Sequence, residues 1–399
     1  MITDLLIRIF VRNHERTSNM KVREEYGKFA GLTGIATNFL LFFIKIIAGL
    51  MTGSIAVIAD AVNNLTDTGS SLVTWAGFKI SAKPADADHP YGHARMEYVS
   101  GLAVSIIVLF LGVQLLITSV GKILHPEEID FTLSSLGILV IAIILKLWQY
   151  MFYRKISRLI DSSALLATSA DSRNDVFATS AVLASALLNR MAGLNLDGYL
   201  GAAVSVFIII SGIQLIIGTI SPLLGNPPSR ETVREIYDRI LSYDGIIGLH
   251  DLSVHNYGVG RCYASVHCEV PAEQDIMVSH DIIDNIERDF KEEMDIQLVI
   301  HLDPVVMNDD RTNRLKEDVA ALVGEISPEL RIHDFRAVWS VTHTNIIFDV
   351  VVPFEFKMSD EQLKRTIMAA VKDLNPSYGA VITIDHDYVP DMAERSDNR

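Results

Sequence analysis

Six long apolar segments before residue 225 constrain the fold more than any other feature of this chain. A bilayer has a hydrocarbon core about 30 Å thick, so about 20 apolar residues in helical conformation cross it. Each segment reaches this length once a few polar interruptions are allowed. The sequence therefore predicts six transmembrane helices in a domain over residues 29–225, centred on 29–52, 55–80, 98–122, 132–156, 163–190 and 198–221.

The orientation in the membrane follows from the flanking charges. Basic residues concentrate in the N-terminal segment 1–28, between the second and third apolar segments and after the fourth, whereas the connection 125–130 is acidic. Basic loops remain on the cytoplasmic side of a membrane. We therefore predict an integral protein of a bacterial-type cell membrane, with both termini in the cytoplasm.

The remainder of the chain has the composition of a water-soluble region. The acidic excess of the chain, a net charge of −15, lies almost entirely after residue 225. Such a surface attracts cations and repels nucleic acid, so no nucleic-acid partner is expected. The two cysteines, Cys262 and Cys268, form neither a disulfide framework nor a CxxC metal motif.

Two of the apolar segments contain charged residues, which are costly in hydrocarbon. Each costs about 2.5 kcal/mol or more at the bilayer centre, so such residues are functional candidates. Asn63 and Asp67 are four residues apart, as are Asp171 and Asp175, so each pair shares one helix face. A lone polar residue of this kind often only joins helices by hydrogen bonds. Two matched pairs with three carboxylates instead predict a cation site with four oxygen ligands.

A second candidate site lies between the second and third segments. The loop PADADHPYGHARME brings Asp86, His89 and His93 within a few residues of one another. A carboxylate and two imidazoles at these offsets suit a divalent cation. A plain polar loop has the same composition, so the loop motif alone does not decide between the two.

These motifs together resemble the cation diffusion facilitator family over about residues 20–305. Members of that family are homodimeric antiporters that export divalent metal ions in exchange for protons. The resemblance implies the same here: a secondary active transporter, not an enzyme, working by alternating access. It also implies a transport site at Asn63, Asp67, Asp171 and Asp175, and a loop site at Asp86, His89 and His93.

The ligand types predict the cargo. Zinc-transporting relatives commonly have histidine in the transport site, and this chain has none there. An oxygen-only set suits manganese(II), and the residues also resemble the manganese-exporting branch. Zinc and iron(II) remain alternative cargoes, since most sites bind later first-row ions more tightly. The crowded carboxylates repel one another, so we expect protons to replace the departing metal as counter-ion.

A group of helix-breaking residues at 225–229 ends the apolar part of the chain, and the pattern of apolar and polar residues then changes. Residues 230–243 and 276–291 have helical periodicity, while 250–257, 261–270 and 296–302 alternate as strands. This αββαβ order predicts an α+β ferredoxin-like cytoplasmic domain over 226–307. The resemblance implies the same fold, and its use in dimer contact.

Five residues of this tail match metal-binding positions of family members: His250, His267, His280, His301 and Asp303. A lone histidine is more often an ordinary polar residue. The set as a whole suits zinc or another divalent metal bound through imidazole nitrogen. Asp303 is placed to bridge two ions.

The tail also repeats itself. LHDLSVHNYG at 249–258 aligns with IHDFRAVWSV at 332–341, and IHLDPV at 300–305 with IDHDYV at 384–389, an offset near 83. This predicts a second αββαβ module within 308–399 with a disordered end. The general interpretation of this module is a structural or interface role. The more specific interpretation is a second metal sensor that uses His333, Asp349, Asp385 and Asp387.

Two other classes of protein also place charge within membrane helices or on a tail. An intramembrane aspartyl protease needs two catalytic acids, but no GxGD motif accompanies Asp171 or Asp175. A membrane metal sensor would use the tail ligands alone, which leaves the paired residues of the helices unexplained.

Overall fold

We describe a computed structural model of the chain. It describes residues 2–17, 19–52, 55–125, 133–192, 196–307, 309–353 and 355–386. The predicted disordered end, Asp387 and most of the acidic connection at 125–130 lie outside these ranges. The chain divides into two compact units: a helical unit, Met1–Asn226 with Asn256–Arg261, and a tail unit, Pro227–His255 with Cys262–Arg399.

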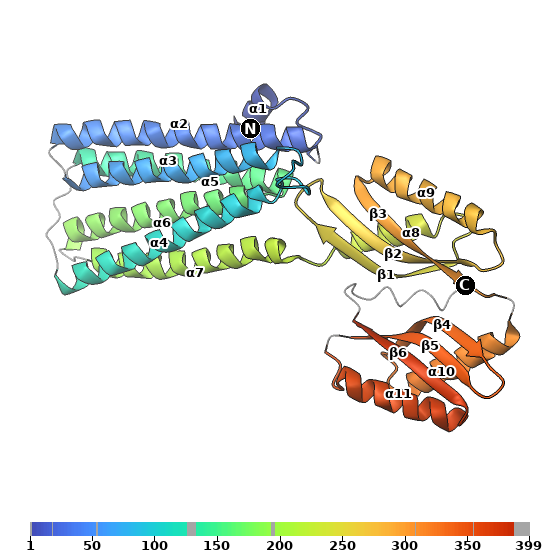
Figure 1. Cartoon of the computed structure of the whole chain (residues 1–399). Helices are drawn as coiled ribbons and strands as arrows, with labels where there is room; N and C mark the ends of the chain where they lie inside the picture. The colour runs from blue at the N-terminus through green and yellow to red at the C-terminus, as the bar shows by residue number, and fades with distance from the viewer. Residues whose placement is uncertain are drawn as a thin grey trace. The chain divides into compact units, whose positions relative to one another are not determined.

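The described residues of the helical unit form one short helix and six long ones (Figure 1). The long helices run side by side, with α4 packed along α7, α2 along α3, and α5 along α6. The bounds are α1 Ile2–Phe10, α2 Met20–Thr52, α3 Ile55–Ser81, α4 Met96–Leu124, α5 Leu133–Ile160, α6 Ser163–Ala192 and α7 Asp197–Leu224.

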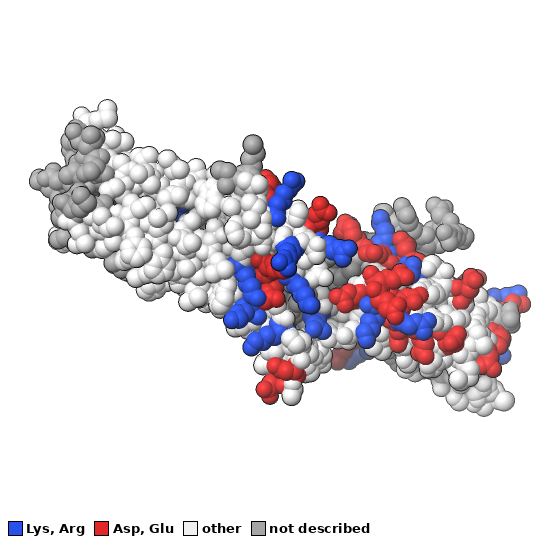
Figure 2. Space-filling model, turned by 90° about the horizontal axis from the view of Figure 1, so that it is seen from above, with Lys and Arg blue, Asp and Glu red and all other residues white. Residues whose placement is uncertain are grey.

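The outer surface of this bundle is apolar. Large side chains such as Phe43, Ile117 and Ile144 are more than half exposed. Figure 2 shows that the visible face of the helices is uncharged along most of its length, with charged side chains gathered at one end. A surface of this kind is stable in lipid rather than in water.

Four helical segments in the described part of the chain are long and apolar enough to cross a membrane. They are Lys21–Ile47, Met96–Leu124, Leu136–Ile160 and Asp197–Leu224. The other two predicted spans, 55–80 and 163–190, form α3 and α6. Both helices are long enough to cross a bilayer, and they carry the polar pairs.

An ion pair joins the first and third long helices. The guanidinium of Arg23 donates from Nη2 to both carboxylate oxygens of Glu97, at 3.1 Å each. Both residues are 5% exposed. Losing one partner of such a buried pair leaves an uncompensated charge, so this contact fixes α2 against α4.

The first tail module has the αββαβ order predicted from the sequence. Its elements are α8 Arg230–Ile240, β1 Gly248–Asn256, β2 Cys262–Pro271, α9 Ile276–Glu293 and β3 Ile296–Val305. The strand order is β1-β2-β3, and β2 and β3 are parallel. Alternate β2 residues such as Val266 join Ile236 and Phe290 in a hydrophobic core. The intervening residue His267 therefore lies on the other face of the sheet.

The second tail module repeats this order: α10 Asp310–Ile326, β4 Arg331–Trp339, β5 Thr344–Val352, α11 Asp360–Leu374 and β6 Tyr378–His386. Strand β5 pairs antiparallel with β4 and parallel with β6. The module has its own core, in which Phe348 of β5 packs with Val319 and Val371 from the two helices. Asp349 therefore lies on the face away from the helices, as His267 does in the first module.

The strand registers correct the sequence alignment of the repeat. Cys262 pairs with Ile296 in the first module, and Thr344 pairs with Tyr378 in the second. Strands β2 and β3 thus correspond to β5 and β6 at an offset of 82. Asp303 therefore corresponds to Asp385, whereas aligning IHLDPV with IDHDYV is wrong by two residues. A slip of two residues preserves the face of a strand, which is why the pattern still aligned.

Candidate metal centres

The carboxylates predicted from the two helix pairs meet inside the bundle. Asp67 comes from α3, and Asp171 and Asp175 come from neighbouring turns of α6. One ligand oxygen of each lies within 4.8 Å of the others. Asp67 is 2% and Asp171 6% exposed. The fourth predicted ligand, Asn63, has its side chain outside the described part, while the adjacent Asn64 is buried.

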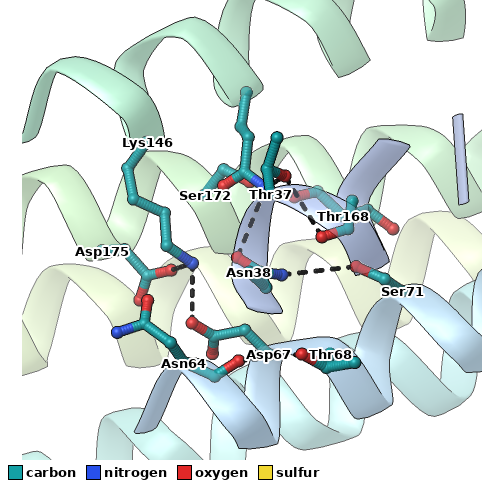
Figure 3. Close-up of polar contacts among 12 residues, drawn as sticks. Thr37, Asn38, Asn64, Asp67, Thr68, Ser71, Lys146, Thr168, Ser172 and Asp175 are labelled. Carbon is teal, nitrogen blue, oxygen red and sulfur yellow. Dashed lines mark hydrogen bonds and ion pairs between the residues drawn. The ribbon is translucent and has the colours of Figure 1, made fainter. Parts of the chain in front are cut away.

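A lysine that the sequence reasoning missed completes this group, which we call the bundle cluster. Lys146 of α5 places Nζ 2.6 Å from Asp67 Oδ2 and 2.6 Å from Asp175 Oδ2 (Figure 3). The lysine is 4% exposed. A basic residue in the middle of an apolar segment was the available signal, since a buried cation in a membrane helix marks function as much as a buried acid does.

The lysine shows what the bundle cluster can hold. Its ammonium group lies between two carboxylates from different helices, as a bound cation would. Asp67 Oδ1 is buried and has no hydrogen-bond partner among the residues that the structure describes. A buried acceptor without a partner is costly and is usually explained by a ligand or a functional role. The residues present therefore fit a positively charged ligand.

Polar side chains continue from this cluster along the facing helices. Ser71 and Thr74 lie one and two turns after Asp67 on α3, and both are buried. Ser71 accepts a hydrogen bond from Asn38 of α2 at 3.5 Å, and Thr74 bonds Thr168 of α6 at 2.9 Å. Figure 3 shows the contact between Asn38 and Ser71 beside the bundle cluster. The polar column runs from the carboxylates toward the Ser81 end of α3.

The predicted loop residues also lie together, and we call Asp86, His89 and His93 the loop cluster. His89 Nδ1 lies 3.4 Å from Asp86 Oδ1, and His93 Nε2 lies 3.4 Å from Asp86 Oδ2. The backbone N–H of His89 donates to Asp86 Oδ1 at 2.8 Å, which lowers the pKa of that carboxyl. His93 Nδ1 contacts the carbonyl oxygen of Pro84, so Nε2 is directed at the cluster.

Four of the five predicted tail residues lie together, with three histidines around the carboxylate of Asp303. Asp303 Oδ2 lies 2.9 Å from His267 Nδ1 and 3.4 Å from His250 Nε2, and Asp303 Oδ1 lies 3.4 Å from His301 Nε2. We call these residues the tail cluster. The neighbours of Asp303 differ in exposure, because His250 is 9% exposed whereas the His301 side chain is 66% exposed. Three imidazoles around one carboxylate suit zinc-type coordination.

His280, the fifth predicted tail residue, lies apart from this group. Its side chain on α9 is 64% exposed, and Nδ1 lies 3.5 Å from Asp284 Oδ2. The two cysteines do not join the cluster either. Burial, with the carboxylates of Asp303 and Glu269, raises the pKa of the Cys268 thiol to about 12, and burial also raises that of Cys262. Neutral thiols are poor metal ligands.

An apolar helical bundle with a buried carboxylate cluster, followed by a histidine-bearing α/β tail, defines a membrane protein that handles cations. The sequence comparisons specify the class. Residues 32–224 match the cation efflux transmembrane domain, and residues 228–305 match the cytoplasmic domain of cation efflux proteins. Together these matches cover more than half of the chain. The chain belongs to the cation efflux family.

Individual relatives support this assignment. An uncharacterized transporter of Methanocaldococcus jannaschii is 28% identical over 251 residues, which is 63% of this chain and 88% of the relative. The cation-efflux pump FieF of Salmonella newport is 26% identical over 287 residues, 71% of this chain and 95% of FieF. The resemblance to the family is thereby confirmed. The second tail module lies after the last residue that the family domains match.

Proposed function

We propose that the chain exports manganese(II) from the cytoplasm in exchange for protons, as a secondary active transporter of the manganese-exporting branch. The observation that carries this proposal is the bundle cluster. Its three carboxylates, two of them buried, offer oxygen ligands, and its residues include neither an imidazole nor a thiolate. Such a set suits a harder ion than zinc. With Asn63 as the fourth ligand, it forms the transport site.

The membrane arrangement proposed here has six spans. Helices α3 and α6 cross the bilayer with α2, α4, α5 and α7, and they turn their polar faces inward. The burial of Asp67 and Asp171 supports this arrangement. Both termini lie in the cytoplasm of a bacterial-type cell. There the ferredoxin-like tail binds zinc at His250, His267, His301 and Asp303, and joins two chains into a homodimer. The match of residues 228–305 to the cytoplasmic domain of cation efflux proteins supports the location of this tail.

Lys146 supplies the competition on which exchange depends. Its ammonium lies where a metal ion would bridge Asp67 and Asp175, so the ion and the ammonium cannot both bind there. Metal binding therefore requires the long, flexible lysine side chain to withdraw. When the metal leaves, the lysine returns to Asp67 and Asp175, and protons offset the negative charge that remains on the three carboxylates. The carboxylates of the bundle cluster are therefore never left without a neutralising cation. Charged carboxylates without one would cost much free energy in the low dielectric of the bundle.

The test is transport into proteoliposomes driven by an imposed pH gradient. Manganese, zinc and iron(II) are compared for the unaltered chain and for Asp175→Ala, with a protonophore as the control for coupling. We expect manganese flux that depends on the gradient and disappears in the variant. Preference for zinc or iron(II) would change the cargo to that ion. Flux that survives in Asp175→Ala would overturn the proposed site.

A membrane metal sensor is the second candidate function, because the tail cluster alone would serve it. Such a protein would bind metal at His267 and Asp303 and would show no flux. The two functions separate in the same experiment, since a sensor does not accumulate metal inside the vesicles.

A further inference from the structure

The second tail module places a histidine where the first has a metal-ligand candidate. His333 of β4 corresponds to His250 of β1 in the repeat, and an aspartate follows each of them. Both aspartates, Asp251 and Asp334, have a left-handed backbone conformation, with φ of 53° and 50°. Few residues adopt this conformation, and aspartate is among those that tolerate it. The two modules therefore share a strand irregularity at the same position.

Three carboxylates surround His333, and we call these four residues the second tail cluster. His333 Nε2 lies 3.4 Å from Asp385 Oδ2 on β6 and 3.7 Å from Asp251 Oδ1 on β1. Asp349 of β5 is the direct strand partner of His333. One ligand atom from each of Asp251, His333, Asp349 and Asp385 lies within 4.8 Å of the others. Three ligands come from the second module and one from the first.

Two imidazoles of this region make no hydrogen bond within the described part of the chain. The His333 side chain is 13% exposed, and neither of its ring nitrogens has a hydrogen-bond partner among the described residues. The same holds for the ring nitrogens of His250, which is 9% exposed, and the two ring centroids are 4.6 Å apart. Buried imidazoles without hydrogen bonds are unusual in a folded protein. Their nitrogens, directed at carboxylates, are arranged as ligands are.

No lysine or arginine forms an ion pair with Asp251, Asp349 or Asp385 among the residues that the structure describes. The nearby Arg336 forms its ion pair with Asp334 instead. Three carboxylates that face one another repel, and a single histidine does not neutralise them. The second tail cluster therefore holds an excess of negative charge that a divalent cation would balance.

We propose that the second tail cluster binds a hard first-row divalent cation, of which manganese(II) is the type, and that this ion joins the two tail modules. Three carboxylates with one imidazole suit such an ion better than zinc, for which the histidine-rich tail cluster is the better site. The imidazole also disfavours magnesium and calcium, which take oxygen ligands. Asp349 stands in the second module at the position that His267 occupies in the first. This exchange of an imidazole for a carboxylate accounts for the different metal preferences of the two clusters.

The test counts manganese bound to the purified full-length chain in detergent, from the loss of the free-ion signal in electron paramagnetic resonance. Every protein carries Asp175→Asn to weaken the bundle cluster. We expect the double variant Asp349→Asn, Asp385→Asn to bind fewer manganese ions, by about one per chain. Asp251→Asn, which alters only the first module, should weaken that same ion by about tenfold or more, as for lost ligand partners elsewhere.

The matched control is Asp373→Asn, which removes one charge from an exposed position of α11 in the same module. It should leave the manganese count unchanged. His333→Gln serves as a milder variant if the double substitution disturbs folding, and it should lose the same ion. An unchanged count in both variants overturns the site. If the ion is lost in the variants of the second module but retained in Asp251→Asn, the ion does not join the two modules. If the cluster clearly prefers zinc to manganese, the proposed type of metal ion is wrong. Each result can be obtained whether or not the chain transports metal.

Discussion

The bundle cluster and the tail cluster contain similar numbers of ligands but differ in how their charge is balanced. In the bundle, the side chain of Lys146 is 5% exposed and contacts two carboxylates at 2.6 Å. In the tail, one carboxylate faces three imidazoles, and two of these side chains are more than a third exposed. A buried group of carboxylates must exchange one cation for another, whereas imidazoles at a surface can retain or lose a metal independently. This difference is expected if the bundle cluster binds its cation only transiently during transport and the tail cluster retains a metal ion.

The largest expected effect is on flux, from removing one carboxylate of the bundle cluster. Asp67→Asn keeps the shape of the side chain but loses a ligand charge and the contact with Lys146. We expect metal transport to fall by about 100-fold, at the upper end of the losses seen when metal sites are altered. Vesicle uptake measures it. The control is Asp161→Asn, on the surface between α5 and α6, whose φ of 46° asparagine tolerates. Equal losses in the two variants would contradict a special role for Asp67.

The next effect is on stability and affinity, from removing the lysine. Lys146→Gln leaves buried carboxylates without their partner, which should destabilise the metal-free protein by about 3 to 5 kcal/mol. The same change removes the competitor of the metal, so metal should bind at least about tenfold more tightly and raise the unfolding temperature more than in the unaltered protein. Calorimetry with and without manganese measures both.

Lys122→Gln is the matched control for this prediction. Lys122 also pairs with a carboxylate, that of Asp197 at 2.6 Å, but its side chain is 35% exposed and it lies on α4. Its loss should cost about 1 kcal/mol or less. It should leave the response to manganese unchanged. If Lys146→Gln binds metal no more tightly than Lys122→Gln, the ammonium does not compete with the cargo.

A smaller effect on flux is expected from the tail. His267→Ala removes the imidazole closest to Asp303, at 2.9 Å. We expect zinc bound to the tail to be lost, while flux per transporter changes by less than about threefold, because the bundle cluster is untouched. Zinc content by elemental analysis, beside uptake, measures the two outcomes. His255→Ala is the control. A loss of flux as large as that in Asp67→Asn would erase the distinction between the two clusters.

The smallest effect is a pH dependence confined to the tail. Burial and then the nearby His333 lower the pKa of His250 below its usual value of 6.5. The unfolded chain therefore binds more protons than the folded chain as the pH falls below about 6.5, and stability decreases there. We expect the metal-free tail to unfold at lower temperature at pH 5.5 than at pH 7.5. His250→Gln should reduce this difference, and a difference of full size in that variant would assign the pH dependence to other groups.

The sequence predicted those parts of the molecule in which a local pattern determines the geometry. The four-residue spacing of Asp171 and Asp175 places both on one face of α6, and the short loop leaves Asp86 and His93 little freedom to separate. Alternation along the strands also predicted the αββαβ order of both tail modules. In these cases the contacts are close in sequence or follow from periodicity.

What the sequence did not predict depends on contacts between distant elements. Lys146 reaches Asp67 from a helix 79 positions further along the chain, and nothing in its own segment reveals this partner. Asp251 and His333 meet across two modules, although each lies in an unremarkable strand. The alignment of the repeat was wrong by two residues at β6, because a strand pattern of period two is equally satisfied by that slip.

The high pKa of the two cysteines has a practical consequence for spectroscopy. Thiolate is the form that reacts with maleimides and methanethiosulfonates, and a thiol with a raised pKa forms less of it at neutral pH. Buried Cys268 and half-buried Cys262 should therefore react more slowly with these reagents than an exposed cysteine does. Single cysteines introduced on the helix-free faces of β1 and β4 can carry spin labels, and the distance between them would report directly whether manganese draws the two modules together.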